Sequence, residues 1–219
     1  MTVSINLKVF LFAVLFYFTK QIQIYALLMI FALIHEMGHL ICGLLLGFKP
    51  KALKIMPLGI SIEFRVENED YNKKIKLGNI LAVKKMIIAL AGPITNLLII
   101  LICLITKKYF ENELYIKIIY TNILIAVFNM LPIYPLDGGR ALKSLLHIIK
   151  GNEKSAQLIN SISNASIIFI TMIASIGIYY YKNIAILLII SYLWMVLIME
   201  NKKYRIKKRI YKIMKNSLK

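Results

Sequence analysis

Three residues with chemical potential lie in the apolar stretch FALIHEMGHLICG, residues 31–43: His35, Glu36 and His39. Side chains four residues apart project from one face of a helix, so the two imidazoles are expected to point the same way. At this spacing two neutral imidazoles can hold zinc while the glutamate acts as a base toward a metal-bound water, whose pKa falls to about 7. Two histidines bonded across packed helices are the alternative. We favour the metal site, because burying Glu36 in an apolar helix is costly.

Catalytic zinc takes three protein ligands, so a third is needed. Ten residues of the chain are acidic, and besides Glu36 only Asp137 lies in apolar surroundings. It belongs to FNMLPIYPLDGGR, residues 128–140, where Pro132 and Pro135 are expected to interrupt a helix. The two glycines that follow allow close backbone approach. Asp137 is therefore our candidate for the third ligand, with a helix N-cap as the alternative.

Cys42 and Glu200 are two other candidates for the third ligand. Cys42 is seven residues after His35 and shares its helical face. However, three ligands from one straight helix, spaced about 5 Å apart, fit poorly around bonds of about 2 Å. Glu200 stands at a helix end beside a basic tail, where a salt bridge is ordinary.

The elements that must position these residues are membrane helices. Apolar residues make up 59% of the 219 residues, and they fall in blocks close to the ~20 residues that cross a bilayer. The first block is not followed by a small-residue cleavage site, so we expect it to be retained. The prediction is an all-α polytopic membrane protein, with one domain over residues 1–200 and a tail over 201–219. Its six spans are expected at 3–19, 22–47, 86–106, 114–133, 162–181 and 183–199.

The distribution of positive charge predicts the orientation. With six spans, 23 Lys and Arg residues lie on the side of the termini and 5 on the other side. Cytoplasmic loops carry the excess of positive charge, so both termini and both long loops are expected in the cytoplasm. The second and fourth spans then both run inward, which lets Asp137 approach the two histidines.

The loop after the second span contains a different pattern. Apolar and polar residues alternate over 58–65, after Pro57, which predicts a strand or short hairpin at the membrane. An exposed strand edge could hold a substrate in extended form. Ser61 and Ile62 are the candidate contact residues on this edge.

The tail carries nine basic residues with Ile206, Ile210 and Ile213 at helical spacing. This pattern predicts an amphipathic helix on anionic lipid at the cytoplasmic surface. Although the net charge of +18 is typical of nucleic-acid-binding proteins, most Lys and Arg residues flank apolar blocks, so we expect no nucleic acid partner.

Three motifs together resemble the site-2 protease family, most closely its stage IV sporulation protein FB branch. They are HEMGH at 35–39, AGPITN at 91–96 and NMLPIYPLDGGR at 129–140. The resemblance implies an intramembrane zinc metalloprotease with one zinc ion. In it, His35, His39 and Asp137 are the ligands and Glu36 is the general base.

The resemblance also implies substrate-engaging roles for Asn96, Asn129, Pro132 and Pro135. It implies a bacterial cell membrane, such as the mother-cell membrane around a forespore, and regulation by inhibitory membrane proteins. The expected substrate is a membrane-tethered sigma factor precursor, with an anti-sigma factor or a signal peptide as alternatives. A zinc carrier that does not cleave protein would use the same ligands without needing Glu36 as a base.

Overall fold

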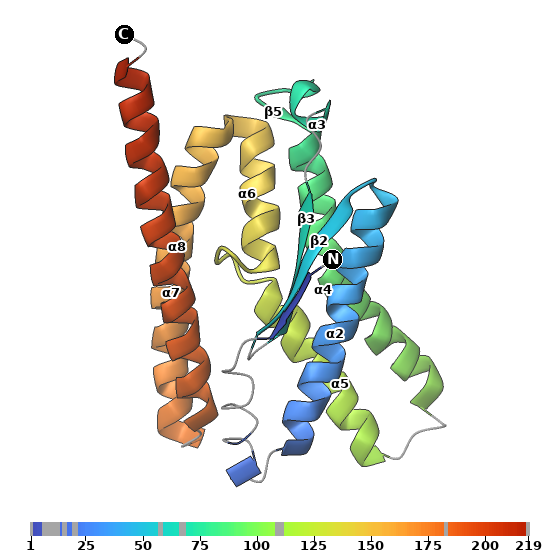
Figure 1. The fold of residues 1–219 in the computed structure, drawn as a ribbon. Helices are drawn as coiled ribbons and strands as arrows, with labels where there is room; N and C mark the ends of the chain where they lie inside the picture. Colours follow the sequence, from blue (N-terminus) through green and yellow to red (C-terminus); the bar gives the residue numbers. More distant parts are fainter. Residues whose placement is uncertain are drawn as a thin grey trace. The chain divides into compact units, whose positions relative to one another are not determined.

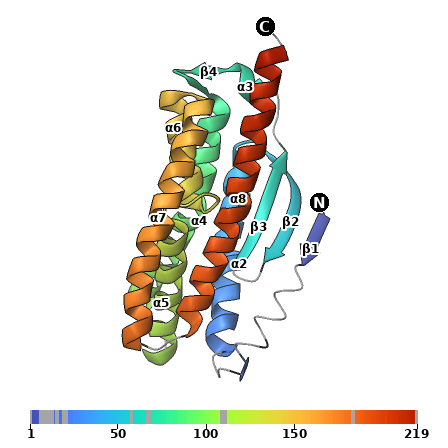
Figure 2. The same cartoon turned by 90° about the vertical axis from the view of Figure 1, so that its left-hand side faces the viewer.

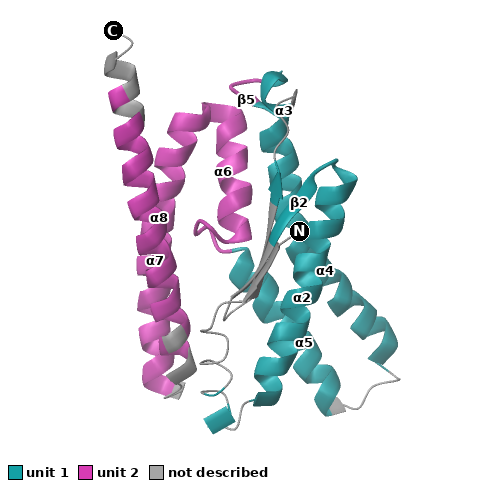
Figure 3. Ribbon diagram, viewed as in Figure 1, with its two compact units in different colours: residues 1–74, 79–130 teal, residues 75–78, 131–219 magenta. Residues whose placement is uncertain are grey.

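The computed structural model of the chain describes residues 2–5, 14, 17–18, 22–56, 59–65, 69–107, 112–181 and 184–217. It divides into two compact units (Figure 3). Unit 1 comprises residues 1–74 and 79–130, and unit 2 comprises residues 75–78 and 131–219.

Three helices form the body of unit 1. They are α2 (Ile22–Leu45), α4 (Ile80–Thr106) and α5 (Asn112–Asn129), and each contacts the other two (Figure 1). Gly38 of α2 makes the α2–α4 contact close, because a Cβ at this position would meet the side chain of Thr95 and, at 3.2 Å, the carbonyl oxygen of Ala91. The two helices that carry the HEMGH and AGPITN motifs therefore pack almost backbone to backbone.

The end of α2 is fixed by a glycine in the left-handed region. Gly47 has φ +87° and donates to Leu44, while Phe48 donates to the carbonyl oxygen of Gly43. This pair of bonds is the Schellman arrangement that satisfies the last carbonyls of a helix. It turns the chain directly into the first strand after α2.

A three-stranded sheet packs along α2 in unit 1. Strand β2 (Lys49–Met56) pairs antiparallel with β3 (Gly59–Arg65) and parallel with β1 (Thr2–Ile5), as Figure 2 shows. The order β1-β2-β3 leaves β3 at an edge. The ring of Phe64 occupies the space that a side chain at Gly43 would need, which joins the sheet to α2. The predicted strand after the second span is thus confirmed as a hairpin.

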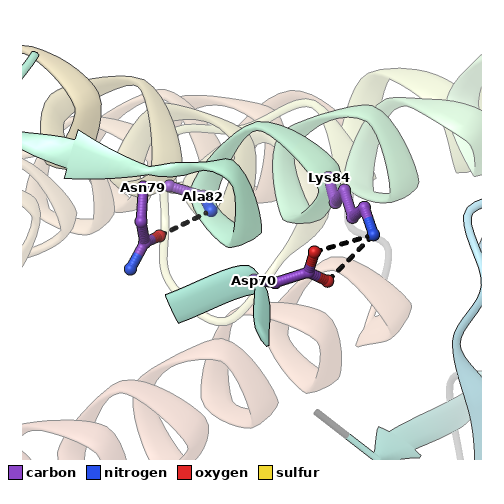
Figure 4. Close-up of polar contacts among 4 residues, drawn as sticks. All are labelled: Asp70, Asn79, Ala82 and Lys84. Atoms are coloured by element: carbon purple, nitrogen blue, oxygen red, sulfur yellow. Dashed lines mark hydrogen bonds and ion pairs between the residues drawn. The ribbon is translucent and has the colours of Figure 1, made fainter. Parts of the chain in front are cut away.

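The start of α4 is held by polar contacts. Short elements α3 (Glu69–Asn72), β4 (Lys74–Ile75) and β5 (Gly78–Asn79) precede it. The Asn79 side chain accepts a hydrogen bond from the Ala82 N–H at 3.0 Å and caps the helix (Figure 4). The Lys84 ammonium group contacts both carboxylate oxygens of Asp70 at 2.9 Å (Figure 4).

Unit 2 is helical. An irregular segment over 131–136 leads into α6 (Asp137–Lys150), α7 (Asn152–Tyr181) and α8 (Ile184–Ser217), with α6 packed on α7 and α7 on α8. Helix α8 continues without interruption from the predicted sixth span into the basic tail. The tail is therefore helical as predicted, but it is an extension of α8 rather than a separate element.

Three helices of the described chain are long and apolar enough to cross a membrane, α2, α4 and residues 152–180 of α7. The outer surface of α4 fits contact with lipid, since Leu98, Leu101 and Ile105 are all more than half exposed. The chain is an integral membrane protein. That the chain has six membrane spans stays a prediction.

Two predicted spans differ from the structure. The first, residues 3–19, begins in β1, so the start of this block is a strand, and most of the rest lies outside the described residues. The fourth was predicted to reach residue 133, whereas α5 ends at Asn129. Pro132 accounts for the earlier end, because a proline ring disfavours the helical conformation at the residue before it, here Leu131.

Candidate metal centre

The two histidines of the HEMGH motif face each other in the interior of unit 1. His35 and His39 are 3% and 4% exposed on α2, and their rings meet edge to face. The two Nε2 nitrogens are 3.2 Å apart. The four-residue spacing has thus brought one nitrogen of each imidazole close to the other.

The other nitrogen of each ring faces a hydrogen-bond acceptor. The Nδ1 of His35 contacts Oδ1 of Asn96, and the Nδ1 of His39 lies 2.7 Å from the carbonyl oxygen of Ile88. A carbonyl oxygen cannot donate, so each Nδ1 carries the proton when the ring is neutral. Both Nε2 atoms then present lone pairs.

Two lone pairs at 3.2 Å repel each other unless a cation lies between them. Zinc binds imidazole nitrogen at about 2.0–2.1 Å, and at a tetrahedral angle two such nitrogens are about 3.3–3.4 Å apart. The separation of the two Nε2 atoms fits this value. Carboxylate or carbonyl acceptors on Nδ1 are also the usual outer partners of zinc-binding histidines. The two Nε2 atoms are therefore spaced as two ligands of one metal ion would be, and zinc fits this spacing.

Gly92 of the AGPITN motif makes room for this pair. A Cβ built on Gly92 would lie well under 3.0 Å from Nε2 of both His35 and His39, which is closer than real Cβ atoms come. No side chain larger than hydrogen fits here without displacing the imidazoles. Pro93 follows inside α4, where it removes one backbone donor but leaves the helix continuous over Ile80–Thr106.

Glu36 follows His35 on α2 and is half-buried. Cys42, the rejected ligand, is a half-buried free thiol farther along the same helix.

The structure assigns different surroundings to the predicted substrate-contacting residues of unit 1. Asn96 is fully buried, with its oxygen toward His35 and its nitrogen donating to Asn122 at 2.8 Å. Asn129 is half-buried at the end of α5 and donates to the carbonyl oxygen of Ile125. Ser61 and Ile62 pair in register with Lys54 and Leu53, and their side chains lie outside the described part of the structure.

Asp137, the predicted third ligand, is in unit 2. It is the first residue of α6 and is 5% exposed, and Arg140 lies 3.7 Å from its carboxylate. The N-cap is Leu136, so the alternative that Asp137 caps this helix is wrong. Gly139 packs against the backbone of Ile133, where a Cβ would collide with main-chain atoms. The predicted close approach of the glycine pair is thus seen at Gly139.

The segment with Pro132 and Pro135 is anchored within unit 2. The Tyr134 N–H donates to Oγ of Ser163 on α7 at 2.9 Å, and Ile133 is 1% exposed. The Lys143 ammonium group lies over the Tyr134 ring, 4.4 Å from its centroid. Burial lowers the pKa of Lys143, and Lys207 lowers it further. Glu200, the second rejected ligand, pairs instead with Lys203 at 2.5 Å.

One polar residue was missed by the sequence analysis. Asn122 of α5 is fully buried and accepts a hydrogen bond from Asn96, which in turn contacts His35. A signal was present, because a polar residue within an apolar membrane helix is a functional candidate by default. Its partner could not be read from sequence, since the contact joins two residues 26 positions apart on different helices.

Comparison with known protein families agrees with this geometry. The family model for peptidase family M50 matches residues 23–112 and 107–173, which together are most of the chain. The chain belongs to peptidase family M50.

Individual relatives are more distant. A zinc metalloprotease of Methanocaldococcus jannaschii is 24% identical, over 65% of this chain and 40% of the relative. Stage IV sporulation protein FB of Bacillus subtilis is 26% identical, over 52% of this chain and 37% of the relative. The chain thus spans about two fifths of the length of these curated relatives. The solved site-2 protease from Methanocaldococcus jannaschii has the same fold, with a TM-score of 0.68 and 20% identity over 91% of each chain.

Proposed function

We propose that this chain is an intramembrane zinc metalloprotease, which hydrolyses a peptide bond in or next to a membrane segment of a protein substrate. The observation that carries the proposal is the buried pair His35 and His39, whose two Nε2 atoms face each other 3.2 Å apart. Glu36 follows in the same motif, and the chain belongs to a peptidase family.

The proposed ligands for one zinc ion are His35, His39 and Asp137. All three are buried, and two imidazoles with one carboxylate are a donor set that zinc uses in catalytic sites. When bound, zinc supplies a water of lowered pKa and polarises the scissile carbonyl. Asp137 suits the third position because its carboxylate oxygen and the ring nitrogens of the two histidines all lie within 4.8 Å of one another.

Glu36 is the proposed general base and acid. Its carboxylate accepts a proton from the attacking water as oxygen bonds to the scissile carbonyl carbon. It then returns that proton to the amine nitrogen as the carbon–nitrogen bond breaks. Both transfers use one carboxylate that shares a helix with two ligands, so their positions are fixed relative to one another.

Substrate engagement is proposed at the edge of β3. A membrane segment in helical form has its carbonyl groups occupied by hydrogen bonds and must be unwound before attack. Strand β3 lies at the edge of its sheet, and pairing to Ser61 and Ile62 would hold the substrate extended. Asn129 is the better candidate for a substrate backbone contact, because Asn96 is fully buried and both of its amide atoms have partners.

The substrate class follows from similarity alone. Stage IV sporulation protein FB is among the relatives, and this supports a membrane-tethered sigma factor precursor as substrate, in a bacterial cell membrane during sporulation. Inhibitory membrane proteins are the corresponding partners. An anti-sigma factor or a signal peptide is the alternative substrate.

The test is Glu36→Gln in the full chain, co-expressed with a membrane-tethered sigma factor precursor. We expect cleavage to fall to background while zinc bound to the purified protein stays near the wild-type amount. Cleavage at the wild-type rate would refute the mechanism. Absence of zinc from the wild-type protein would refute the metal site itself.

A further inference from the structure

Asn122 is a buried residue with no assigned role, and its contacts lead to the candidate metal centre. It is fully buried in α5, and its Nδ2 donates to the carbonyl oxygen of Ile118 at 2.9 Å. Its Oδ1 accepts from Nδ2 of Asn96 at 2.8 Å, and Oδ1 of Asn96 contacts Nδ1 of His35. This chain of hydrogen bonds, which we term the amide relay, joins α5, α4 and α2.

The relay has a direction, and it is set at one end by a backbone group. The Ile118 carbonyl oxygen can only accept, so the amide group of Asn122 that faces it must be the NH₂ group. The oxygen of Asn122 then faces Asn96, which must offer its own NH₂ group. The oxygen of Asn96 is left for His35, and Nδ1 of that ring must carry the proton.

The direction matters because a neutral imidazole has its proton on only one nitrogen. A proton on Nδ1 leaves Nε2 of His35 with the lone pair that a metal requires. If Asn96 were turned over, its NH₂ group would face Nδ1 and stabilise the tautomer with the proton on Nε2. That proton would point at Nε2 of His39, 3.2 Å away, and would occupy the ligand position.

Asn96 alone cannot set this direction, because an amide group is nearly symmetric in shape and can rotate by 180°. Its environment must distinguish oxygen from nitrogen, and the atom that does so in the structure is Oδ1 of Asn122. We propose that Asn122 is a positioning residue of the zinc site, which acts through Asn96 to hold His35 in its metal-binding tautomer. This inference rests on the proposed function only in that the metal is zinc.

The test is a double-mutant cycle on zinc affinity, with the full chain in detergent or nanodiscs and a competing chelator. Outer partners of metal ligands typically contribute 10–100-fold in affinity. We expect Asn96→Leu to weaken zinc binding by about 10–100-fold and Asn122→Leu by about tenfold. The double variant should bind no more weakly than Asn96→Leu alone, because both changes remove the same constraint on His35. If the fold-loss in zinc affinity of the double variant equals the product of the two single losses, Asn122 acts on packing and the proposal is overturned.

Thr121→Val is the matched control. Thr121 precedes Asn122, is 3% exposed and donates only along its own helix, to the carbonyl oxygen of Lys117 at 2.7 Å. The substitution removes a buried polar group from the same turn of α5 without touching the relay. Zinc affinity within about twofold of the wild type is expected, and a loss equal to that of Asn122→Leu would refute the relay.

The tautomer itself can be observed in nitrogen-15 spectra of labelled histidine. The chain has three histidines, so His147→Gln leaves two rings to assign. In the full chain stripped of zinc, we expect a proton on Nδ1 of His35. In Asn122→Leu, we expect that signal to shift toward the tautomer with the proton on Nε2. An unchanged tautomer would overturn the proposal, whereas a wild-type protein that never binds zinc would overturn the proposed function instead.

Discussion

At the scale of single residues, the facing of His35 and His39 could be predicted but their hydrogen-bond partners could not. The spacing of His35 and His39 is a property of one helix, and helical geometry alone places both rings on one face. The partners Asn96, Ile88 and Asn122 come from α4 and α5, and their contacts depend on how closely those helices pack. Sequence indicated that Asn96 was functional but suggested the substrate as its partner. The structure gives it a ring nitrogen instead.

Gly92→Ala tests the space around the imidazoles. The added Cβ would overlap both Nε2 atoms, so either the rings or α4 must move. We expect zinc in the purified protein to fall to less than a tenth of the wild-type amount, measured by elemental analysis. Gly177→Ala in α7 is the control, since its Cβ would meet nothing closer than 3.7 Å. Full zinc content in Gly92→Ala would contradict the geometry of the site.

The third ligand is tested by Asp137→Asn against Cys42→Ala. Removing the carboxylate should reduce zinc content and cleavage by at least tenfold, because a neutral amide is a far weaker zinc ligand. Removing the thiol should change neither. Zinc lost from Cys42→Ala and retained in Asp137→Asn would show that the assignment is wrong.

At the scale of elements, the sequence pattern predicted the hairpin, whose two strands are neighbours in the chain, but not the pairing of β1 with a distant strand. Alternation over 58–65 predicted a strand, and the structure has the hairpin of β2 and β3. Strand β1 was not foreseen, because Thr2–Ile5 reads as the start of an apolar span. Its partner β2 is about fifty residues away, and such a pairing leaves no periodic signal in either segment.

The edge of β3 provides a prediction about substrate binding. Proline at Ser61 or Ile62 removes a backbone N–H. At one of these two positions the N–H points away from β2, and there the proline removes a hydrogen-bond donor to the substrate. That variant should cut cleavage of a fixed substrate at least tenfold while zinc content stays near normal. Ser61→Ala should have little effect, because main-chain pairing is largely indifferent to the side chain. Normal cleavage by both proline variants would leave β3 as a connector only.

At the scale of the whole molecule, composition predicted the class of protein. Long apolar blocks indicated a membrane protein, and three described helices satisfy the length and apolarity required. The orientation follows from charge rather than from fold, because flanking Lys and Arg residues act during insertion. Nothing in the helix packing depends on which side is the cytoplasm, so this part of the prediction needs its own experiment.

Reporter fusions test the orientation. From the division of 23 positive residues against 5, reporters after Lys219 and within residues 67–76 should both indicate cytoplasm. A reporter within residues 107–113 should indicate the opposite side. A reversed signal at any one position would contradict the six-span arrangement and move the candidate site to the other half of the membrane.

The continuity of α8 has a consequence for the basic tail. Residues 200–217 extend the helix by about 27 Å at 1.5 Å per residue. Counterions at physiological salt screen a surface potential within about 8 Å. If α8 leaves the bilayer upright, only the first of its cationic side chains, such as Lys202 and Lys203, lie within that distance of the lipid phosphates. The remaining charge then stands in bulk electrolyte, where salt neutralises it in part and where an acidic protein surface can reach it.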